Sequence, residues 1–223
     1  MAIIEKYNEK GIKIYHGDCM EAMREMPDKS FELAIVDPPY GIGINSMNMG
    51  SRQTIKPDNK KWDKAIPTSE YFFELFRVSK EQIIWGGNYF FLPPSRCYIV
   101  WDKGEGMYGR DFAECEQAWV SFDKSARIYK HNPNQLDRIH VTQKPVKLYE
   151  WLLTNYAKTG DKILDTHLGS GSSAIACDNL GFELTAYELD EEYVDGAIKR
   201  LIEHRQQLKL FTAGLVDDEE RGK

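Results

Sequence analysis

The feature that most constrains the fold is residues 31–40, with the sequence FELAIVDPPY. The apolar run at 33–36 predicts a strand buried on both faces, as in a parallel sheet. Two consecutive prolines cannot donate hydrogen bonds to a neighbouring strand, so the strand must end there. The turn then fixes the Asp37 carboxylate and the Tyr40 ring beyond the carboxyl end of a strand, where open α/β sheets bind ligands. Taken alone, the tetrapeptide is equally consistent with a rigid turn and a capping aspartate.

The rest of the chain alternates between predicted strands and helices. Strands are predicted at 12–15, 82–85, 96–101, 117–122, 162–165 and 183–187. Helices are predicted at 19–26, 68–80 and 148–156, from the turn at 168–172 through 180, and from 193 to about 210. This alternation indicates an α/β fold with a mostly parallel sheet and helices on both faces. The strands at 96–101 and 117–122 are close enough in sequence to pair as an antiparallel unit at one edge.

Length and composition favour a single domain in the cytoplasm. We expect 223 residues to form one domain, 1–223, with polar insertions at 41–64 and 123–139. No apolar run reaches the length of a membrane span, and the first residues do not resemble a signal peptide. The four cysteines are scattered without a CxxC pair, which favours reduced thiols and gives no indication of a metal site.

The net charge of −6 argues weakly against a polyanionic partner, but the charge is unevenly distributed. Basic residues outnumber acids at 52–64 and 124–147, whereas 183–195 carries only acids. The two basic stretches are either solvated loops or one positively charged surface.

A second motif, ILDTHLGSGS at 163–172, is a strand followed by a small-residue turn and a helix start. Glycines at such a turn let a ligand approach the backbone, and the helix start presents free N–H groups. A nucleotide site of this kind places an acid at the end of the next strand, where Glu188 lies. Ala174 occupies the third position of the dinucleotide fingerprint, which tolerates alanine, so spacing alone leaves a dinucleotide open. Asp165 at the turn would repel a pyrophosphate and favours a nucleoside-type cofactor with a positive charge.

Four motifs in this order resemble a known family. The chain resembles S-adenosylmethionine-dependent DNA amino-methyltransferases of the permuted order, in which the catalytic motif precedes the cofactor motif. The matching stretches are Asp37-Pro38-Pro39-Tyr40, residues 165–172, HVTQKP at 140–145, and Gly17-Asp18. The chain departs from the family pattern at Asp165-Thr166-His167, where Asp-Pro-Phe is usual. It also lacks a large recognition insertion, leaving 41–64 and 123–139 for target recognition.

The resemblance implies a Rossmann-like class I methyltransferase fold and a methyl transfer to the N6 amine of adenine in DNA. In this interpretation Asp37 and the Pro38 carbonyl accept hydrogen bonds from the amine, and Tyr40 stacks on a base flipped out of the duplex. Asp18 would bind the cofactor's adenine, Glu188 its ribose and Lys144 its carboxylate. Cytosine N4, an RNA or protein amide substrate, and a non-catalytic nucleotide-binding module are the alternatives.

The resemblance also implies the full set of site residues. The catalytic residues are Asp37, Pro38, Pro39 and Tyr40. The residues that bind S-adenosylmethionine are Asp18, Cys19, Asp37, Thr142, Lys144, Asp165, His167, Gly169, Ser170, Gly171, Ser172, Glu188 and Leu189. The residues that contact DNA are Arg52, Lys56, Lys60, Lys61, Arg127, Lys130 and Arg138. DNA is the expected partner, a membrane is not, and a homodimer is left open. The family setting is restriction–modification in bacteria or phages.

Overall fold

The computed structural model describes residues 2–43, 63, 65–110, 113–133, 139 and 142–220, with side chains up to residue 207. Its strands are β1 (Ile4–Glu9), β2 (Ile12–His16), β3 (Phe31–Val36), β4 (Ser79–Trp85), β5 (Tyr98–Asp102), β6 (Cys115–Val120), β7 (Arg127–Lys130), β8 (Lys162–Asp165) and β9 (Glu183–Glu188). Its α-helices are α1 (Cys19–Glu25), α2 (Ser69–Val78), α3 (Val146–Tyr156), α4 (Ser172–Leu180) and α5 (Glu191–Glu220), and two short 3-10 helices are η3 (Gly87–Tyr89) and η4 (Glu105–Met107).

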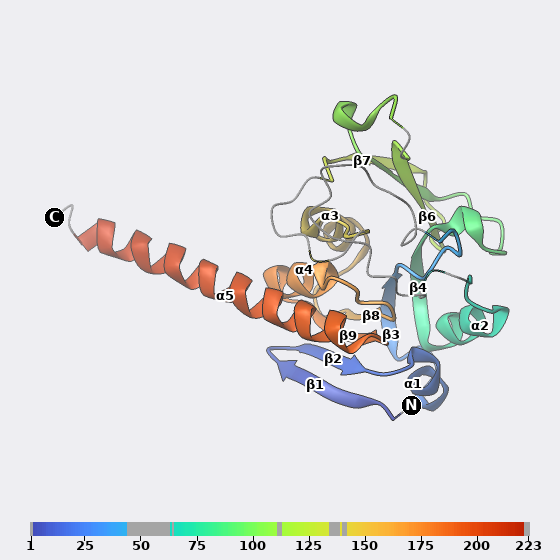
Figure 1. The fold of residues 1–223 in the computed structure, drawn as a ribbon, viewed down its shortest axis with the longest axis horizontal. Helices are drawn as coiled ribbons and strands as arrows, with labels where there is room; N and C mark the ends of the chain where they lie inside the picture. Colours follow the sequence, from blue (N-terminus) through green and yellow to red (C-terminus); the bar gives the residue numbers. More distant parts are fainter. Residues whose placement is uncertain are drawn as a thin grey trace.

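All of these strands belong to one sheet, in the order β1-β2-β9-β8-β3-β4-β6-β5-β7 (Figure 1). The central strands β2, β9, β8, β3 and β4 run parallel to one another. The predicted antiparallel unit is present, since β6 pairs antiparallel with both β4 and β5. A second antiparallel pair, β1–β2, closes the opposite edge. The predicted α/β, mostly parallel, Rossmann-like fold is therefore confirmed.

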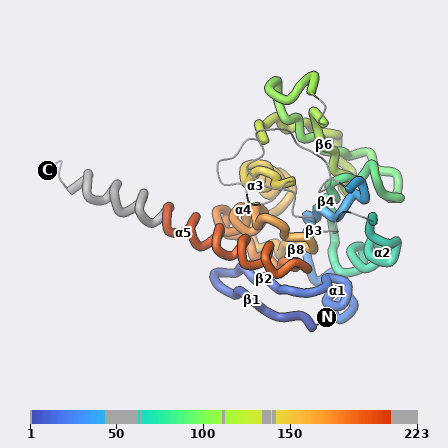
Figure 2. The backbone as a smooth tube through the Cα atoms, viewed as in Figure 1, coloured from blue at the N-terminus to red at the C-terminus, as the bar shows by residue number. Residues whose placement is uncertain are grey.

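Helices cover both faces of this sheet, and each face has its own apolar core. The helices α3, α4 and α5 pack on one face, against side chains such as Ile35 and Ile163. On the other face α1 and α2 pack against the alternate positions, such as Ala34 and Val36. Successive side chains of a strand point to opposite faces, so a strand that is apolar throughout serves both cores. Figure 2 shows α1 and α2 together at one side of the backbone trace and α3, α4 and α5 together at the other.

Two strands were not predicted because both lie at sheet edges and carry mostly exposed residues. In β1 only Tyr7 is buried, and β7 has the sequence RIYK with no buried residue. Neither segment shows the apolar run that indicates a strand. The prediction of a helix over 68–80 was also too long: α2 ends at Val78, and β4 begins at Ser79 without a loop, its hydroxyl donating to Leu75 O at 2.5 Å.

The parallel strands bring their carboxyl ends to one edge, and this arrangement positions the site. Asp18, Glu188, Asp165 and Asp37 lie at or just beyond the ends of β2, β9, β8 and β3 respectively. Strand β2 is in register with β9, so that His16 lies opposite Glu188. The two acids of the predicted cofactor site are therefore brought together by strand pairing. Within the described part of the chain, no helix combines the length and apolarity needed to cross a bilayer.

Candidate active site

The carboxyl edge of the sheet contains a cavity of about 410 Å³. This volume lies within the range of small-molecule and cofactor sites. All of the residues expected to bind a cofactor line the cavity, with the exception of Asp165 and Gly171. Asp37 and Pro39 line the same cavity, so the two motifs that lie far apart in the sequence share one space.

The glycine-rich turn forms one wall of the cavity and is packed tightly against α5. Gly171 caps the start of α4 with φ +76°, a left-handed conformation that favours glycine. A Cβ at this position would lie 2.8 Å from Ala197 Cβ. Gly169 N donates to Glu188 Oε2 at 2.8 Å, which ties the turn to the end of β9.

Two acids stand where the resemblance places the nucleoside of a cofactor. Glu188 accepts from Gly169 N and from Asp190 N at 3.0 Å, and its burial raises its pKa above the ordinary value. Asp18 caps α1 by accepting from Met20 N at 2.9 Å. An ionised carboxylate has about four acceptor positions, so each acid retains capacity for a ligand.

Asp165 is built into the turn and lies behind the cavity wall. It is 2% exposed, accepts from Ser173 Oγ at 2.5 Å, and accepts from His167 N at 3.0 Å. Burial raises the pKa of Asp165 to about 7. Both of its oxygens hold the backbone turn and α4 together, and direct contact between Asp165 and a cationic cofactor stays a prediction.

His167, the departure from the family pattern, packs like an aromatic ring. Its ring lies edge-on to Tyr71, with 5.4 Å between the ring centroids. Its Nδ1 lies 2.9 Å from Thr166 Oγ1, which in turn lies 2.6 Å from the Tyr71 hydroxyl. Burial lowers the pKa of His167 to about 4, so the imidazole is neutral near pH 7. A neutral ring in a hydrogen-bonded chain thus replaces the phenyl ring expected from the resemblance.

The Asp37 carboxylate lies in a buried cluster of charges. It accepts from the Tyr40 hydroxyl at 2.6 Å and from Lys144 Nζ at 2.5 Å. Lys144 Nζ also lies 3.0 Å from Glu116 Oε2, and Lys103 Nζ lies 2.8 Å from the other oxygen of Glu116. The resemblance placed Lys144 on the cofactor's carboxylate, whereas in this structure the ammonium pairs with Asp37 and Glu116.

The protonation of this cluster follows from burial and from the neighbouring charges. Burial raises the pKa of Asp37, and the attraction of Lys144 only partly opposes the rise. Burial would also raise the pKa of Glu116, but Lys144 and Lys103 outweigh it and hold that pKa at about 2. Burial disfavours the charged form of Lys144, yet the two carboxylates hold its pKa above the ordinary value. Lys144 and Glu116 are therefore charged near neutral pH.

Tyr40 is held by a second aromatic ring that the sequence did not indicate. Its ring stacks on Tyr89, with 5.0 Å between centroids and 13° between planes. A Cβ at Gly86 would overlap the Tyr40 ring, and Gly86 has φ +70°. Gly86, directly after β4, thus makes space for Tyr40, whereas a Cβ at Gly87 would meet Trp119.

Glu116 and Lys103 were also missed, for a different reason. Glu116 lies in β6, and Lys103 directly follows the antiparallel neighbour β5. Both are linked to Asp37 only through Lys144. A charged residue in the strand sequence CEQAWV at 115–120 was the one available signal for Glu116.

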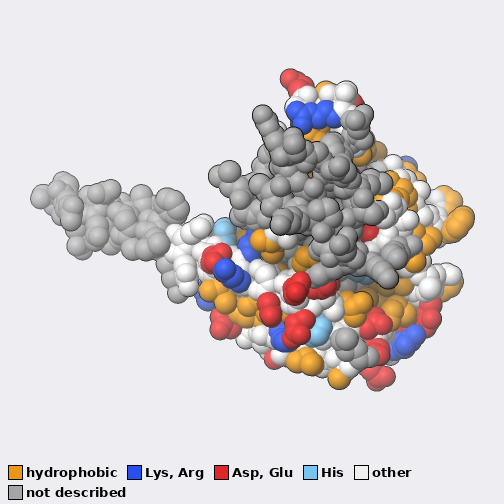
Figure 3. Space-filling model, in the orientation of Figure 1, with side chains coloured by type: hydrophobic (Ala, Val, Ile, Leu, Met, Phe, Trp, Pro, Cys, Tyr) orange, Lys and Arg blue, Asp and Glu red, His pale blue; other side chains and the backbone are white. Residues whose placement is uncertain are grey.

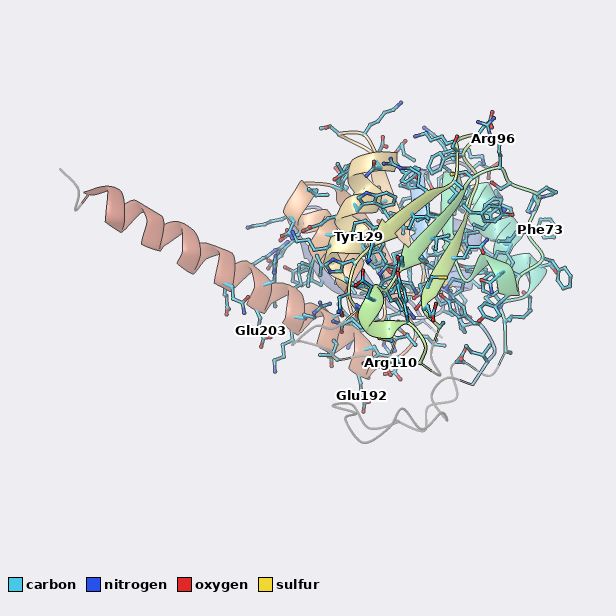
Figure 4. All side chains as sticks on the ribbon, turned by 90° about the horizontal axis from the view of Figure 1, so that it is seen from above. Phe73, Arg96, Arg110, Tyr129, Glu192 and Glu203 are labelled. Atoms are coloured by element: carbon cyan, nitrogen blue, oxygen red, sulfur yellow. The ribbon has the colours of Figure 1, made fainter. Side chains whose placement is uncertain are left out.

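Of the residues expected to contact DNA, Arg127 and Lys130 lie on the edge strand β7. Arg127 donates to Asn155 Oδ1 at 2.7 Å, and its guanidinium lies 5.2 Å from the centre of the Trp151 ring. Lys130 pairs with Glu105 at 3.0 Å. Figure 4 shows Tyr129 of the same strand beside α3, where it stacks on Trp151. The other residues expected to contact DNA lie outside the described residues, namely Arg52, Lys56, Lys60, Lys61 and Arg138.

Comparison with known proteins supports the sequence resemblance. A family model described as DNA methylase, covering the N6 and N4 methyltransferases, matches residues 99–200. Type II methyltransferase M2.DpnII of Streptococcus pneumoniae is 23% identical over an alignment of 244 positions, which covers 87% of this chain and 91% of the relative. The chain is thus similar to DNA methyltransferases of the N6/N4 family.

Solved structures similar to this chain agree on the fold. The M1.HpyAVI–SAM complex aligns with a TM-score of 0.55 and 22% identity, covering 85% of this chain and 99% of the other. The PvuII DNA methyltransferase, described as cytosine-N4-specific, aligns with a TM-score of 0.56 and 12% identity over 88% and 92% of the two chains. The predicted resemblance is confirmed at a level that covers both N6 and N4 targets, and one of the similar structures is a complex with SAM.

Proposed function

We propose that this protein is a methyltransferase that transfers a methyl group from S-adenosylmethionine to the N6 amine of adenine in DNA. The observation that supports this most directly is the shared cavity, in which the glycine-rich turn and Glu188 face the same space as Asp37 and Pro39. A cofactor that lies along the turn would hold its reactive end beside the carboxylate that receives the amine.

The residues of the cavity suit this cofactor. Glu188 and Asp18 offer acceptors for the hydroxyl and amine groups of a nucleoside, while Gly169 leaves the wall without a side chain. Bound S-adenosylmethionine supplies a methyl group on a positively charged sulfur, which keeps the bonding electron pair when the methyl group moves to the amine nitrogen. Holding both reactants in one cavity converts a bimolecular reaction into an effectively unimolecular one.

Asp37 and Pro38 act on the amine itself. An exocyclic amine is a weak nucleophile because its lone pair is delocalised into the ring. Hydrogen bonds from its two N–H groups, to Asp37 and to the carbonyl of Pro38, draw the nitrogen towards a tetrahedral geometry and localise that lone pair. Because burial raises the pKa of Asp37, this carboxylate is also a suitable base for the proton that the amine loses.

Tyr40 and the basic stretches serve the DNA. The Tyr40 ring would stack on a base flipped out of the duplex, replacing part of the stacking that the base loses. Positively charged groups on β7 and in the two insertions would contact the backbone phosphates. A homodimer remains a prediction, which sedimentation with and without DNA tests.

The experiment that tests the proposed function is methyl transfer from labelled S-adenosylmethionine to DNA, RNA and protein, followed by mass spectrometry of the digested product. The expected product is N6-methyladenine in DNA. Detection of N4-methylcytosine instead would show that the same site geometry acts on the other target of the family. Label in RNA or protein alone would overturn DNA as the substrate, and cofactor binding without any transfer would indicate a non-catalytic module.

A further inference from the structure

The cluster around Lys144 contains a carboxylate that the proposed reaction does not use. Lys144 is 3% exposed, and its ammonium contacts Asp37, Glu116 and the Tyr40 hydroxyl, the last at 3.2 Å. An ammonium has three donors, so these contacts use its full capacity. A buried charge is costly unless it is paired, and Lys144 has two carboxylates where one would neutralise it.

Glu116 is the fixed member of this group. It lies in β6, directly opposite Trp101 of β5, and Lys103 holds its second oxygen. Lys144 and Asp37 line the cavity, whereas Glu116 does not. Seen from the cavity, Glu116 therefore lies behind Lys144, on a strand rather than on a loop.

The arrangement has a consequence for an amine that approaches Asp37. Tyr40 occupies one oxygen of Asp37, and Lys144 occupies the other. An incoming amine must share an oxygen with Lys144 or displace it. The target nitrogen also gains positive charge during methyl transfer, and a neighbouring ammonium without a second counter-charge would oppose this gain. Glu116 keeps Lys144 paired at that moment.

We propose that Glu116 is a positioning residue for methyl transfer, which anchors Lys144 and through it sets the orientation and charge of Asp37. This inference rests on the function proposed above and adds a residue to its site. Other titratable groups also face the cluster. They are Lys103, Tyr40, Tyr149, Tyr71 and Asp165.

The charges give two variants opposite effects on Asp37. Glu116→Gln removes a negative charge near Asp37, which lowers the pKa of Asp37 and moves the acid limb of the kcat/KM profile to lower pH. Lys103→Gln removes the positive charge on the far side of Glu116, which moves the same limb to higher pH. A merely structural role would lower activity without moving the limb in opposite directions.

The test uses the full chain with S-adenosylmethionine and a DNA substrate. For Glu116→Gln we expect kcat to fall roughly ten- to a hundredfold, because the acceptor loses its alignment. The dissociation constant for S-adenosylmethionine should stay within about threefold, since Glu116 lies outside the cavity. Glu116→Asp, which restores the charge, should recover the wild-type position of the acid limb.

The matched control is Glu114→Gln. Glu114 is an exposed acid that immediately precedes β6 and accepts from Gly109 N at 2.7 Å, so its loss should leave kcat and the acid limb unchanged. A wild-type kcat in Glu116→Gln overturns the proposal. So does an acid limb that fails to shift in opposite directions in Glu116→Gln and Lys103→Gln.

A second readout separates this proposal from the proposed function. The carboxyl carbon of Asp37 can be titrated by nuclear magnetic resonance in the cofactor-free protein. We expect the pKa of Asp37 to fall in Glu116→Gln and to rise in Lys103→Gln, whatever the methyl acceptor is. If wild-type protein methylates no DNA, the proposed function fails while this titration still decides the role of Glu116. Should Glu116→Gln not fold, Lys103→Gln alone carries the test, and an unshifted Asp37 contradicts the proposal.

Discussion

Two buried carboxylates at adjacent strand ends, Asp37 and Asp165, show how contacts rather than position decide what an acid can do. Asp165 accepts hydrogen bonds from the Ser173 hydroxyl and the His167 backbone N–H, so both of its oxygens are engaged within the turn. Asp37 faces the cavity, and Tyr40 and Lys144 each contact one of its oxygens. The first carboxylate holds the glycine-rich turn together, and the second faces the cavity in which we propose that the amine binds.

The raised pKa of Asp165 predicts a specific dependence of stability on pH. Its folded pKa of about 7 lies above the ordinary value of 3.8, so the folded state binds the proton more tightly. The resulting stabilisation is complete below pH 3.8 and is lost as pH rises through 7. Between pH 5 and pH 8, wild type should therefore lose about 2–3 kcal/mol of unfolding free energy relative to Asp165→Asn. Urea unfolding at the two pH values measures it, and a constant difference would contradict the prediction.

The residues that sequence could predict are those carried by contiguous motifs. Asp37 and Tyr40 are fixed relative to one another by two prolines, and Glu188 follows from the spacing after the glycine-rich turn. Glu116 and Lys103 could not be predicted, because their contact with the site depends on the register of β5 against β6 and on the packing of Lys144. The same limit applies to Tyr89, whose stacking on Tyr40 depends on the backbone around Gly86.

At the scale of elements, the two glycines that flank α4 test how the glycine-rich turn is held in the cavity wall. Gly171 and Gly181 flank it, both with positive φ, but a Cβ at Gly171 would press on Ala197 of α5 whereas a Cβ at Gly181 meets open space. Gly181→Ala should cost only the left-handed backbone, about 1–2 kcal/mol. Gly171→Ala should cost about 1–3 kcal/mol more, because α4 and α5 must move apart.

Thermal or urea unfolding of the two variants compares their stabilities directly. Equal losses of stability would show that α5 can move away from Gly171 at little energetic cost. The comparison has a functional side as well. Gly171→Ala should weaken binding of S-adenosylmethionine, since the displaced turn carries Gly169, while Gly181→Ala should bind it as wild type does.

The sequence predicted the elements that carry apolar periodicity and missed those that do not. Both missed strands, β1 and β7, are exposed edges whose pairing comes from the neighbouring strand rather than from their own side chains. The boundary between α2 and β4 was misplaced because the chain passes from helix to strand at Ser79 without a turn signal. The central strands and their helices, which have a buried face, were located correctly.

At the scale of the whole molecule, a net charge of −6 has to be reconciled with a polyanionic substrate. Figure 3 shows acidic and basic side chains mixed over β1, β2 and the start of α5, at the bottom of that view. Basic residues that serve DNA should instead gather near the opposite edge of the sheet, where β7 lies. Arg127 and Lys130 stand on that edge, and Lys6 and Lys13 stand on the β1–β2 edge.

These two pairs give a charge-matched test of the DNA surface. If Arg127 and Lys130 each contact a phosphate, their double alanine variant should bind DNA more weakly and reduce the slope of log affinity against log salt by roughly 0.9 per contact. The Lys6 and Lys13 double alanine variant loses the same charge and should keep the wild-type slope. Fluorescence anisotropy across a salt series measures both. Equal slopes in the two variants would place the phosphate contacts elsewhere, with the 41–64 insertion the next segment to test.

The measurement that tests the central claim most directly compares Glu188→Gln and Asp37→Asn for cofactor binding and for single-turnover methyl transfer to DNA. If one cavity holds the cofactor at Glu188 and the amine at Asp37, the two variants should fail in opposite ways. Glu188→Gln should weaken S-adenosylmethionine binding by roughly 1.5–3 kcal/mol in calorimetry and keep most of the rate at saturating cofactor. Asp37→Asn should bind the cofactor within a few fold of wild type and lose about a hundredfold or more of the rate. Unchanged affinity in the first variant, or a rate above about a tenth of wild type in the second, would contradict the account.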